Sequence, residues 1–217
     1  MKKINKSVII FIIVMILLSL TNLLNIKMDG EVLKLSGISV IVGVIAYFTT
    51  RKTNNTKTEG FDIKRVFKDY KNPKAIIFSL MVFASIILCD IIAYRFLPEY
   101  NEHVKNRASF AISEDLIKTI LIMAVLTLGE EIAWRAFFQK QTTKMIKFLP
   151  SIILSSALFA LGHYSSGNFT IVAYDLLFVF IDSILFGLIF KETNNAWCSW
   201  IPHFLGDVVA VLALMAL

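Results

Sequence analysis

The amino-acid sequence predicts an all-α, polytopic transmembrane helical bundle of about seven spans, within a range of six to eight. Of the 217 residues, 57% are hydrophobic and only 18% are charged, and the mean hydropathy is +0.71. Soluble domains are far less apolar. Because one helical span takes roughly 20 apolar residues, about seven spans use nearly the whole chain. We therefore expect a single integral membrane domain over residues 1–217.

Seven apolar runs mark the expected spans. They cover residues 8–26, 32–50, 75–97, 116–139, 150–164, 169–190 and 197–217. The first run follows a short basic segment, as in a signal peptide, but it is as long as a span and lacks a small-residue cleavage site, so we expect it to be retained. Within the domain, residues 1–114 hold the N-terminal spans and a basic connection, and residues 115–217 form a core that carries the motifs described below.

Basic residues gather in the connections on one side of the predicted membrane. They precede the first span, fill the connection after the second, and follow the fourth and the sixth: Lys2, Lys3, Lys6, Arg51, Lys52, Lys57, Lys64, Arg65, Lys68, Lys71, Lys74, Lys140, Lys144, Lys147 and Lys191. By the positive-inside rule, the N-terminus is cytoplasmic and the C-terminus lies outside. Topology and contacts with membrane lipids thus explain the net charge of +6, and we expect no nucleic-acid partner.

Two further segments allow simpler interpretations. Residues 53–69 are polar with scattered apolar side chains, and an amphipathic helix on the inner leaflet and a solvated loop are equally compatible with this pattern. The two cysteines, Cys89 and Cys198, lie in apolar runs without CxxC spacing. We expect both to be core residues, with neither a disulfide framework nor a thiolate metal site.

Charged side chains inside the fourth predicted span require an explanation, because each costs several kcal/mol unless it faces the protein interior or a wet cavity. Glu131 and Arg135 stand four residues apart on one helical face, a spacing that permits an ion pair. Glu130 points about 100° away from Glu131, and the residue four positions after it is Trp134. A carboxylate without a fixed counter-charge in such a place is a candidate general base.

Two histidines also lie in apolar runs. His163 ends the fifth predicted span, one turn after Phe159, and His203 lies early in the seventh, one turn before Asp207. Counted from the nearest cytoplasmic lysine, helical rise places Glu130 about 15 Å deep, His163 about 24 Å and His203 about 18 Å. Residues at comparable depth on three helices can share one cavity, where imidazole and carboxylate groups activate water with or without a metal.

Each of these groups also has a purely structural interpretation when taken alone. A lone buried histidine is more often an interhelical hydrogen-bond donor than a catalyst, and Glu131 with Arg135 can simply hold helices together. Taken together, the groups favour a functional site, because the cost of burying all of them is large and no need of the fold explains it.

The pattern resembles a known family. Three motifs carry the resemblance: Glu130-Glu131-x-x-x-Arg135, Phe159-x-x-x-His163 and His203-x-x-x-Asp207. In order and spacing they resemble the motifs of the CAAX-protease and bacteriocin-processing family, also called the Abi family, of intramembrane endopeptidases. The resemblance covers about residues 115–217, and the text around the first motif is similar to that of bacterial members. It implies a location in the bacterial cytoplasmic membrane.

The resemblance also implies a reaction, which is hydrolysis of a peptide bond in a membrane-associated or lipidated peptide. Glu130 and His163 would activate a water molecule, and His203 and Asp207 would stabilise the oxyanion. Glu131, Arg135 and Phe159 would form the scaffold of the site. The biological role implied is maturation of a bacteriocin or signalling peptide, or self-immunity against one.

One position departs from the family's pattern. The eukaryotic CAAX enzyme has asparagine where this chain has Asp207, and an aspartate donates a hydrogen bond only when protonated. An ionised Asp207 would instead orient His203 or bind a metal. Glu130, His163 and His203 are candidate ligands of a divalent metal such as zinc, but no HExxH fixes the geometry, and a glutamate-activated water without metal is the alternative.

Other functions fit the sequence less well. A rhomboid protease needs GxSG and an aspartyl type needs GxGD, and in each case the matching segment lacks the first glycine. A proton-coupled transporter is disfavoured because no pair of broken helices recurs in two related halves. The main alternative is a non-catalytic bacteriocin-immunity or peptide-binding membrane protein.

Overall fold

The computed structural model describes residues 5–24, 27–28, 31–32, 35–53 and 59–216. Its α-helices are α1 (Lys6–Leu20), α2 (Ser36–Thr53), α3 (Val66–Asp69), α4 (Pro73–Phe96), α5 (Tyr100–Arg107), α6 (Leu116–Glu131), α7 (Lys140–Thr142), α8 (Phe148–Gly162), α9 (Phe169–Thr193) and α10 (Ala196–Ala216). The remaining elements are two 3₁₀ turns, η1 (Thr21–Leu24) and η2 (Ile63–Arg65), a π-helix, η3 (Ile132–Gln139), and two short paired strands, β1 (Lys27–Met28) and β2 (Glu31–Val32).

The helical bundle predicted from the sequence is confirmed, and each of the seven apolar runs coincides with a helix. Four helical segments in the described part of the chain are long and apolar enough to cross a membrane: Lys6–Leu24, Pro73–Phe96, Phe169–Thr193 and Ala196–Leu214. Two shorter apolar helices cover Ser36–Arg51 and Phe148–Gly162. The predicted ends at residues 25–26, 33–34 and 217 lie outside the described residues.

Polar residues at the helix boundaries explain where several helices begin. Asn5, Asn72, Asp115 and Asn168 each precede a long helix, and each side chain accepts a hydrogen bond from the backbone N–H two residues later. These bonds satisfy donors that a helix N-terminus leaves free. At the other end of α9, Asn194 adopts a left-handed conformation (φ 47°) that stops the helix.

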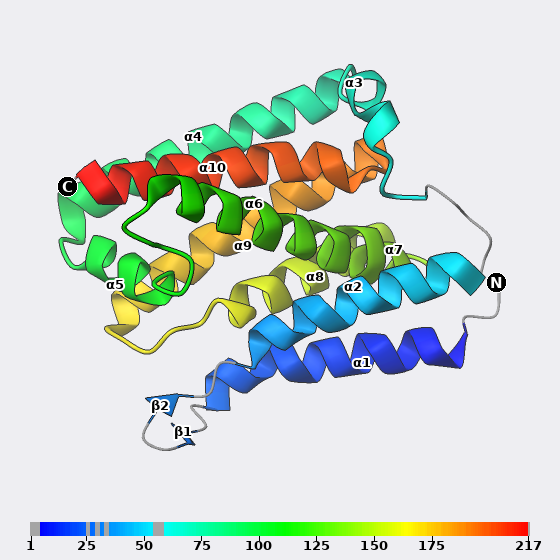
Figure 1. Ribbon diagram of the computed structural model, residues 1–217, viewed down its shortest axis with the longest axis horizontal. Coiled ribbons are helices and arrows are strands. Elements are labelled where there is room, and N and C mark those ends of the chain that lie inside the picture. Colours follow the sequence, from blue (N-terminus) through cyan, green and yellow to red (C-terminus); the bar gives the residue numbers. More distant parts are fainter. Residues whose placement is uncertain (1–4, 25–26, 29–30, 33–34, 54–58, 217) are drawn as a thin grey trace.

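The helices pack as an elongated bundle in which the C-terminal half of the chain is central (Figure 1). α4 packs on α9, α10 lies against both and against α6, and α1 packs on α2, which covers η3. α1 begins at one end of the bundle and α10 finishes at the opposite end (Figure 1). This arrangement agrees with an odd number of passes through the bundle.

The fourth predicted span is α-helical only as far as Glu131. From Ile132 to Gln139 it is a π-helix, and all eight of its side chains are buried. Close contacts with neighbouring helices hold it. A Cβ added to Gly43 of α2 would lie 2.9 Å from the backbone Cα of Ala133. Small residues at such crossings let membrane helices approach closely.

The connections gather at the two ends of the bundle. At one end Lys140 Nζ lies 2.9 Å from a carboxylate oxygen of Glu59, and the side-chain amide of Asn195 donates to the carbonyl of Asp62. We call this end, formed by residues 59–74, 140–147 and 191–196, the basic end. The opposite end, formed by residues 21–24, 97–115 and 163–168, we call the α5 end.

The segment predicted as either an amphipathic helix or a solvated loop forms two short elements, η2 and α3, at the basic end. Residues 54–58 of that segment lie outside the described residues. Ile63 is 62% exposed and Phe67 is 87% exposed. Short helical turns with outward apolar side chains replace the longer amphipathic helix.

Candidate active site

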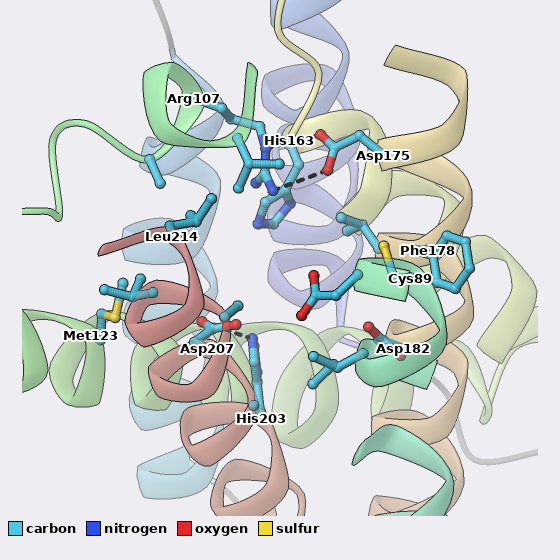
Figure 2. Close-up of a pocket in the computed structure, with 18 of the residues that line it drawn as sticks. Cys89, Arg107, Met123, His163, Asp175, Phe178, Asp182, His203, Asp207 and Leu214 are labelled. Atoms are coloured by element: carbon cyan, nitrogen blue, oxygen red, sulfur yellow. Dashed lines mark hydrogen bonds and ion pairs between the residues drawn. The ribbon is translucent and has the colours of Figure 1, made fainter. Parts of the chain in front are cut away.

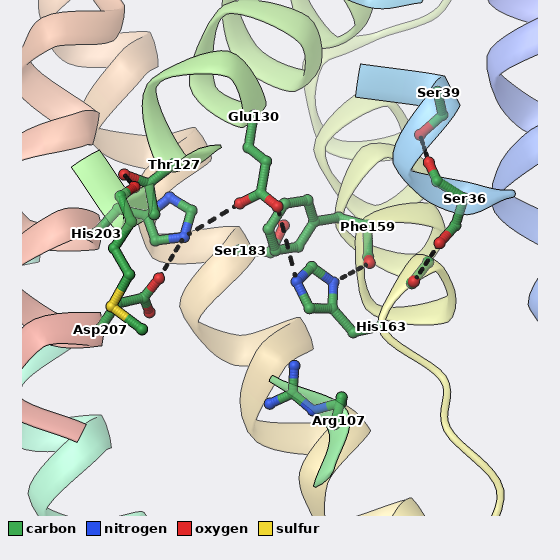
Figure 3. Close-up of polar contacts among 12 residues, drawn as sticks. Ser36, Ser39, Arg107, Thr127, Glu130, Phe159, His163, Ser183, His203 and Asp207 are labelled. Carbon is green, nitrogen blue, oxygen red and sulfur yellow. Dashed lines mark hydrogen bonds and ion pairs between the residues drawn. The ribbon is translucent and has the colours of Figure 1, made fainter. Parts of the chain in front are cut away.

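Glu130, His163 and His203 meet inside the bundle although they come from three different helices. One oxygen of the Glu130 carboxylate lies 4.0 Å from His163 Nε2, and the other lies 3.6 Å from His203 Nε2. Figure 3 shows the carboxylate between the two imidazoles. The side chain of Glu130 is only 20% exposed. The structure thus brings together the three residues that the depth argument placed at one level.

The position of His163 just after α8 determines which nitrogen of its ring carries the hydrogen. Its Nδ1 lies 2.8 Å from the backbone carbonyl of Phe159, one turn earlier. Because a carbonyl only accepts, Nδ1 carries the hydrogen. In the neutral ring, Nε2 then presents its lone pair toward Glu130. The ring of Phe159 also contacts the imidazole, with 4.6 Å between ring centroids.

His203 is oriented by Glu131. A carboxylate oxygen of Glu131 lies 2.9 Å from His203 Nδ1, while the other oxygen lies 3.5 Å from Arg135 Nε. Glu131 therefore contacts two partners, whereas the sequence suggested only Arg135. Asp207 faces the other ring nitrogen of His203, at 3.8 Å, and its side chain is 46% exposed.

Arg135 completes the support beneath the site. Its side chain is 1% exposed, donates to Ser183 Oγ, and lies over the rings of Phe159 and Phe186. Phe186 in turn stacks on His203, with 4.3 Å between centroids. Ser183 and Phe186 could not be predicted as site residues, because a serine and a phenylalanine are ordinary in an apolar helix.

Two cavities meet at these residues. The larger, about 490 Å³, is lined by Glu130, and the smaller, about 180 Å³, is lined by His203. His163 and Asp207 line both. Figure 2 shows the smaller cavity, where Asp182 also faces inward. A chain that extends from one cavity into the other would pass the catalytic candidates.

A second polar cluster ties α5 to α9 beside the site. Arg107 Nε lies 2.9 Å from Asp175 Oδ2, its Nη2 donates to Asp175 Oδ1, and His103 Nε2 lies 3.4 Å from Asp175. Asp175 is buried, and Arg107 lines both cavities. This cluster was not predicted from the sequence. An acid within an apolar run was a usable signal for Asp175, but Arg107 and His103 lie in a polar segment that offers none.

The metal hypothesis can be tested against the side chains present. In the described part of the chain, no group of three or more His, Cys, Asp or Glu residues is arranged to hold a metal ion. The donor set does not fit a zinc site, which needs at least three protein ligands at about 2 Å from the metal. What the geometry offers is one carboxylate flanked by two oriented imidazoles.

Comparison with known proteins gives one match. Residues 112–209 match the family described as Rce1-like, type II CAAX prenyl endopeptidase. No curated protein and no solved structure matches the chain. The family match confirms the resemblance drawn from the three motifs and supports an integral membrane protease that acts on a peptide substrate.

Proposed function

Because residues 112–209 match the Rce1-like family of type II CAAX prenyl endopeptidases, we propose that this chain hydrolyses a peptide bond in a membrane-associated or lipidated peptide. The observation that carries the proposal is the Glu130 carboxylate between the Nε2 atoms of His163 and His203. This arrangement has the parts that water activation requires: a base, a second acceptor and a group that stabilises charge.

In the first step, Glu130 and His163 bind and activate a water molecule. Their facing atoms are 4.0 Å apart, too far for a direct hydrogen bond but suited to a bridging water. Glu130 takes one proton from that water, and Nε2 of His163 accepts a hydrogen bond from the other. The water oxygen then attacks the carbonyl carbon of the scissile bond.

In the second step, His203 and Asp207 stabilise the oxyanion of the tetrahedral intermediate. Carboxyl groups face both nitrogens of the His203 ring, Glu131 at Nδ1 and Glu130 with Asp207 at Nε2. They supply counter-charge for an imidazolium, whose Nε2–H can donate to the oxyanion. A protonated Asp207 would add a second donor. When the C–N bond breaks, the amine leaves with the proton that Glu130 holds.

The larger cavity suits an apolar peptide. Its walls include Val40, Phe110, Met123 and Leu126, and apolar walls with a few polar groups are typical of ligand sites. We assign to the chain a role in maturing a secreted bacteriocin or signalling peptide, or in protecting its producer against one. A non-catalytic immunity protein would use the same cavity for binding alone.

Variants of the candidate base separate these roles. We expect Glu130→Gln and His163→Ala to reduce cleavage by at least a hundredfold, which a mass-spectrometric comparison of membrane peptides can measure. Glu114→Gln is the matched control, since Glu114 is an exposed glutamate in the connection just before α6. Full cleavage by Glu130→Gln would refute the mechanism. If protection against a bacteriocin survives both changes, the binding role is correct instead.

A further inference from the structure

Both cavities are built from one half of the bundle. The larger reaches the α5 end, where Asn22, Ser109 and Tyr164 line it. The smaller is lined by Arg107 and Ala108 from the same end. Among the described residues, none from the basic end (59–74, 140–147 and 191–196) lines either of the two cavities. The way into the site therefore lies at the α5 end.

The opposite side of the site is closed by η3. Immediately after Glu131, every side chain from Ile132 to Gln139 is buried. Gln139 donates to the carbonyl of Gly187, and Thr142 hydrogen-bonds Ser151. This buried packing separates the catalytic candidates from the basic end.

The distribution of charge orients this asymmetric bundle. The described residues at the basic end include the following lysines and arginines: Lys64, Arg65, Lys68, Lys71, Lys74, Lys140, Lys144, Lys147 and Lys191. Among its described residues, the α5 end has only two lysines or arginines, Lys105 and Arg107. Each end has four acids: Glu59, Asp62, Asp69 and Glu192 at the basic end, and Glu99, Glu102, Glu114 and Asp115 at the α5 end. Lysine and arginine near span ends favour the cytoplasmic side, whereas acids contribute little. The basic end is therefore the cytoplasmic one.

From these observations we propose that the catalytic cavity opens to the extracytoplasmic side of the membrane. The substrate is then a peptide segment presented from outside, such as a secreted peptide or the outer end of a membrane-anchored one. A lipidated C-terminus held on the cytoplasmic leaflet would meet the closed side of η3. This inference about the substrate rests on the proposed function, whereas the orientation of the cavity does not.

Thiol labelling tests the orientation directly. In a chain whose two native cysteines are replaced by alanine, Ser109→Cys places a thiol at the rim of the larger cavity, and Lys144→Cys places one at the basic end. Both positions are exposed, so they form a matched pair. In intact cells, we expect a membrane-impermeant maleimide to label Ser109→Cys at least tenfold faster than Lys144→Cys. After permeabilisation the two rates should be similar. The reverse ratio, or equal labelling in intact cells, would overturn the proposal.

A pair of reporters tests the substrate. One peptide reporter is exported and anchored outside, and an identical one is retained on the cytoplasmic leaflet. We expect cleavage of the exported reporter only, with cleavage lost in Glu130→Gln. Cleavage of the cytoplasmic reporter would contradict the inference. Outward labelling without cleavage of either reporter would count against the proposed function and leave the orientation supported.

Discussion

Replacing Glu131 by glutamine weakens two contacts at once, because the Glu131 carboxylate lies between Arg135 and His203. The change keeps the size of the side chain but removes the counter-charge of an arginine that is only 1% exposed. Breaking a buried ion pair from one side costs about 3–5 kcal/mol. At about 2–4 °C per kcal/mol for a chain of this length, the unfolding midpoint should fall by roughly 6–20 °C.

The chain offers its own reporter of unfolding. Its two cysteines are free and buried, so a thiol-reactive fluorophore reacts when the bundle opens. In detergent, we expect Glu131→Gln to show the lower midpoint and also a loss of cleavage of about tenfold, equivalent to about 1.4 kcal/mol. The second loss arises because His203 Nδ1 exchanges a charge-assisted bond for a neutral one.

A compensated variant distinguishes the two effects. Glu131→Gln with Arg135→Met removes both buried charges, and such replacements are often neutral or stabilising. We expect the double variant to regain most of the lost stability and to remain about tenfold less active. If the double variant cleaves as fast as the unaltered chain, Glu131 acts only through Arg135, and its role in orienting His203 is refuted.

Three further outcomes are expected. Asp207→Asn should keep the cleavage rate within about threefold of that of the unaltered chain, because a side-chain amide always has a hydrogen to donate. Asp207→Ala should reduce the rate by about a hundredfold. A strong loss in the asparagine variant would show that the carboxylate is required. Dialysis against a chelator should leave both the unfolding midpoint and cleavage unchanged, since the described residues hold no three-ligand group; a fall in either would reveal a bound metal. Gly187→Leu should lower the unfolding midpoint, because a Cβ at this glycine already lies 2.7 Å from Gln139 Oε1, while Gly37→Ala, with open space around it, should leave the midpoint unchanged.

Much of the fold was predictable because the bilayer restricts what the chain can do. Long apolar runs must become helices there, and Asn72 or Asp115 before such a run marks its start through a capping bond. Helical rise also predicts similar depths for Glu130, His163 and His203. These arguments need only spacing along one helix at a time.

Contacts between helices were less predictable. The proximity of Glu131 to His203 joins residues 72 positions apart, and no local pattern encodes it. The π-helix after Glu131 depends on the packing of η3 against α2 and α9, since its sequence is compatible with an ordinary helix. Arg107 reaches Asp175 from a short polar helix that hydropathy treats as a loop. In each case, the local structure depends on a contact with residues that are distant in the sequence.

The closed packing of η3 also has an electrical consequence. In the outward orientation, the cavity carries the potential of the external solution deep into the bundle, so the transmembrane voltage falls mainly across η3. Moving one elementary charge through that voltage costs about 2.3 kcal/mol per 100 mV. Glu130 lies on the outer side of η3, so its proton exchange with the external solution crosses little of the field. We therefore expect the turnover rate to be insensitive to membrane potential. The buried packing of η3 also prevents ions from leaking across the membrane through the cavity.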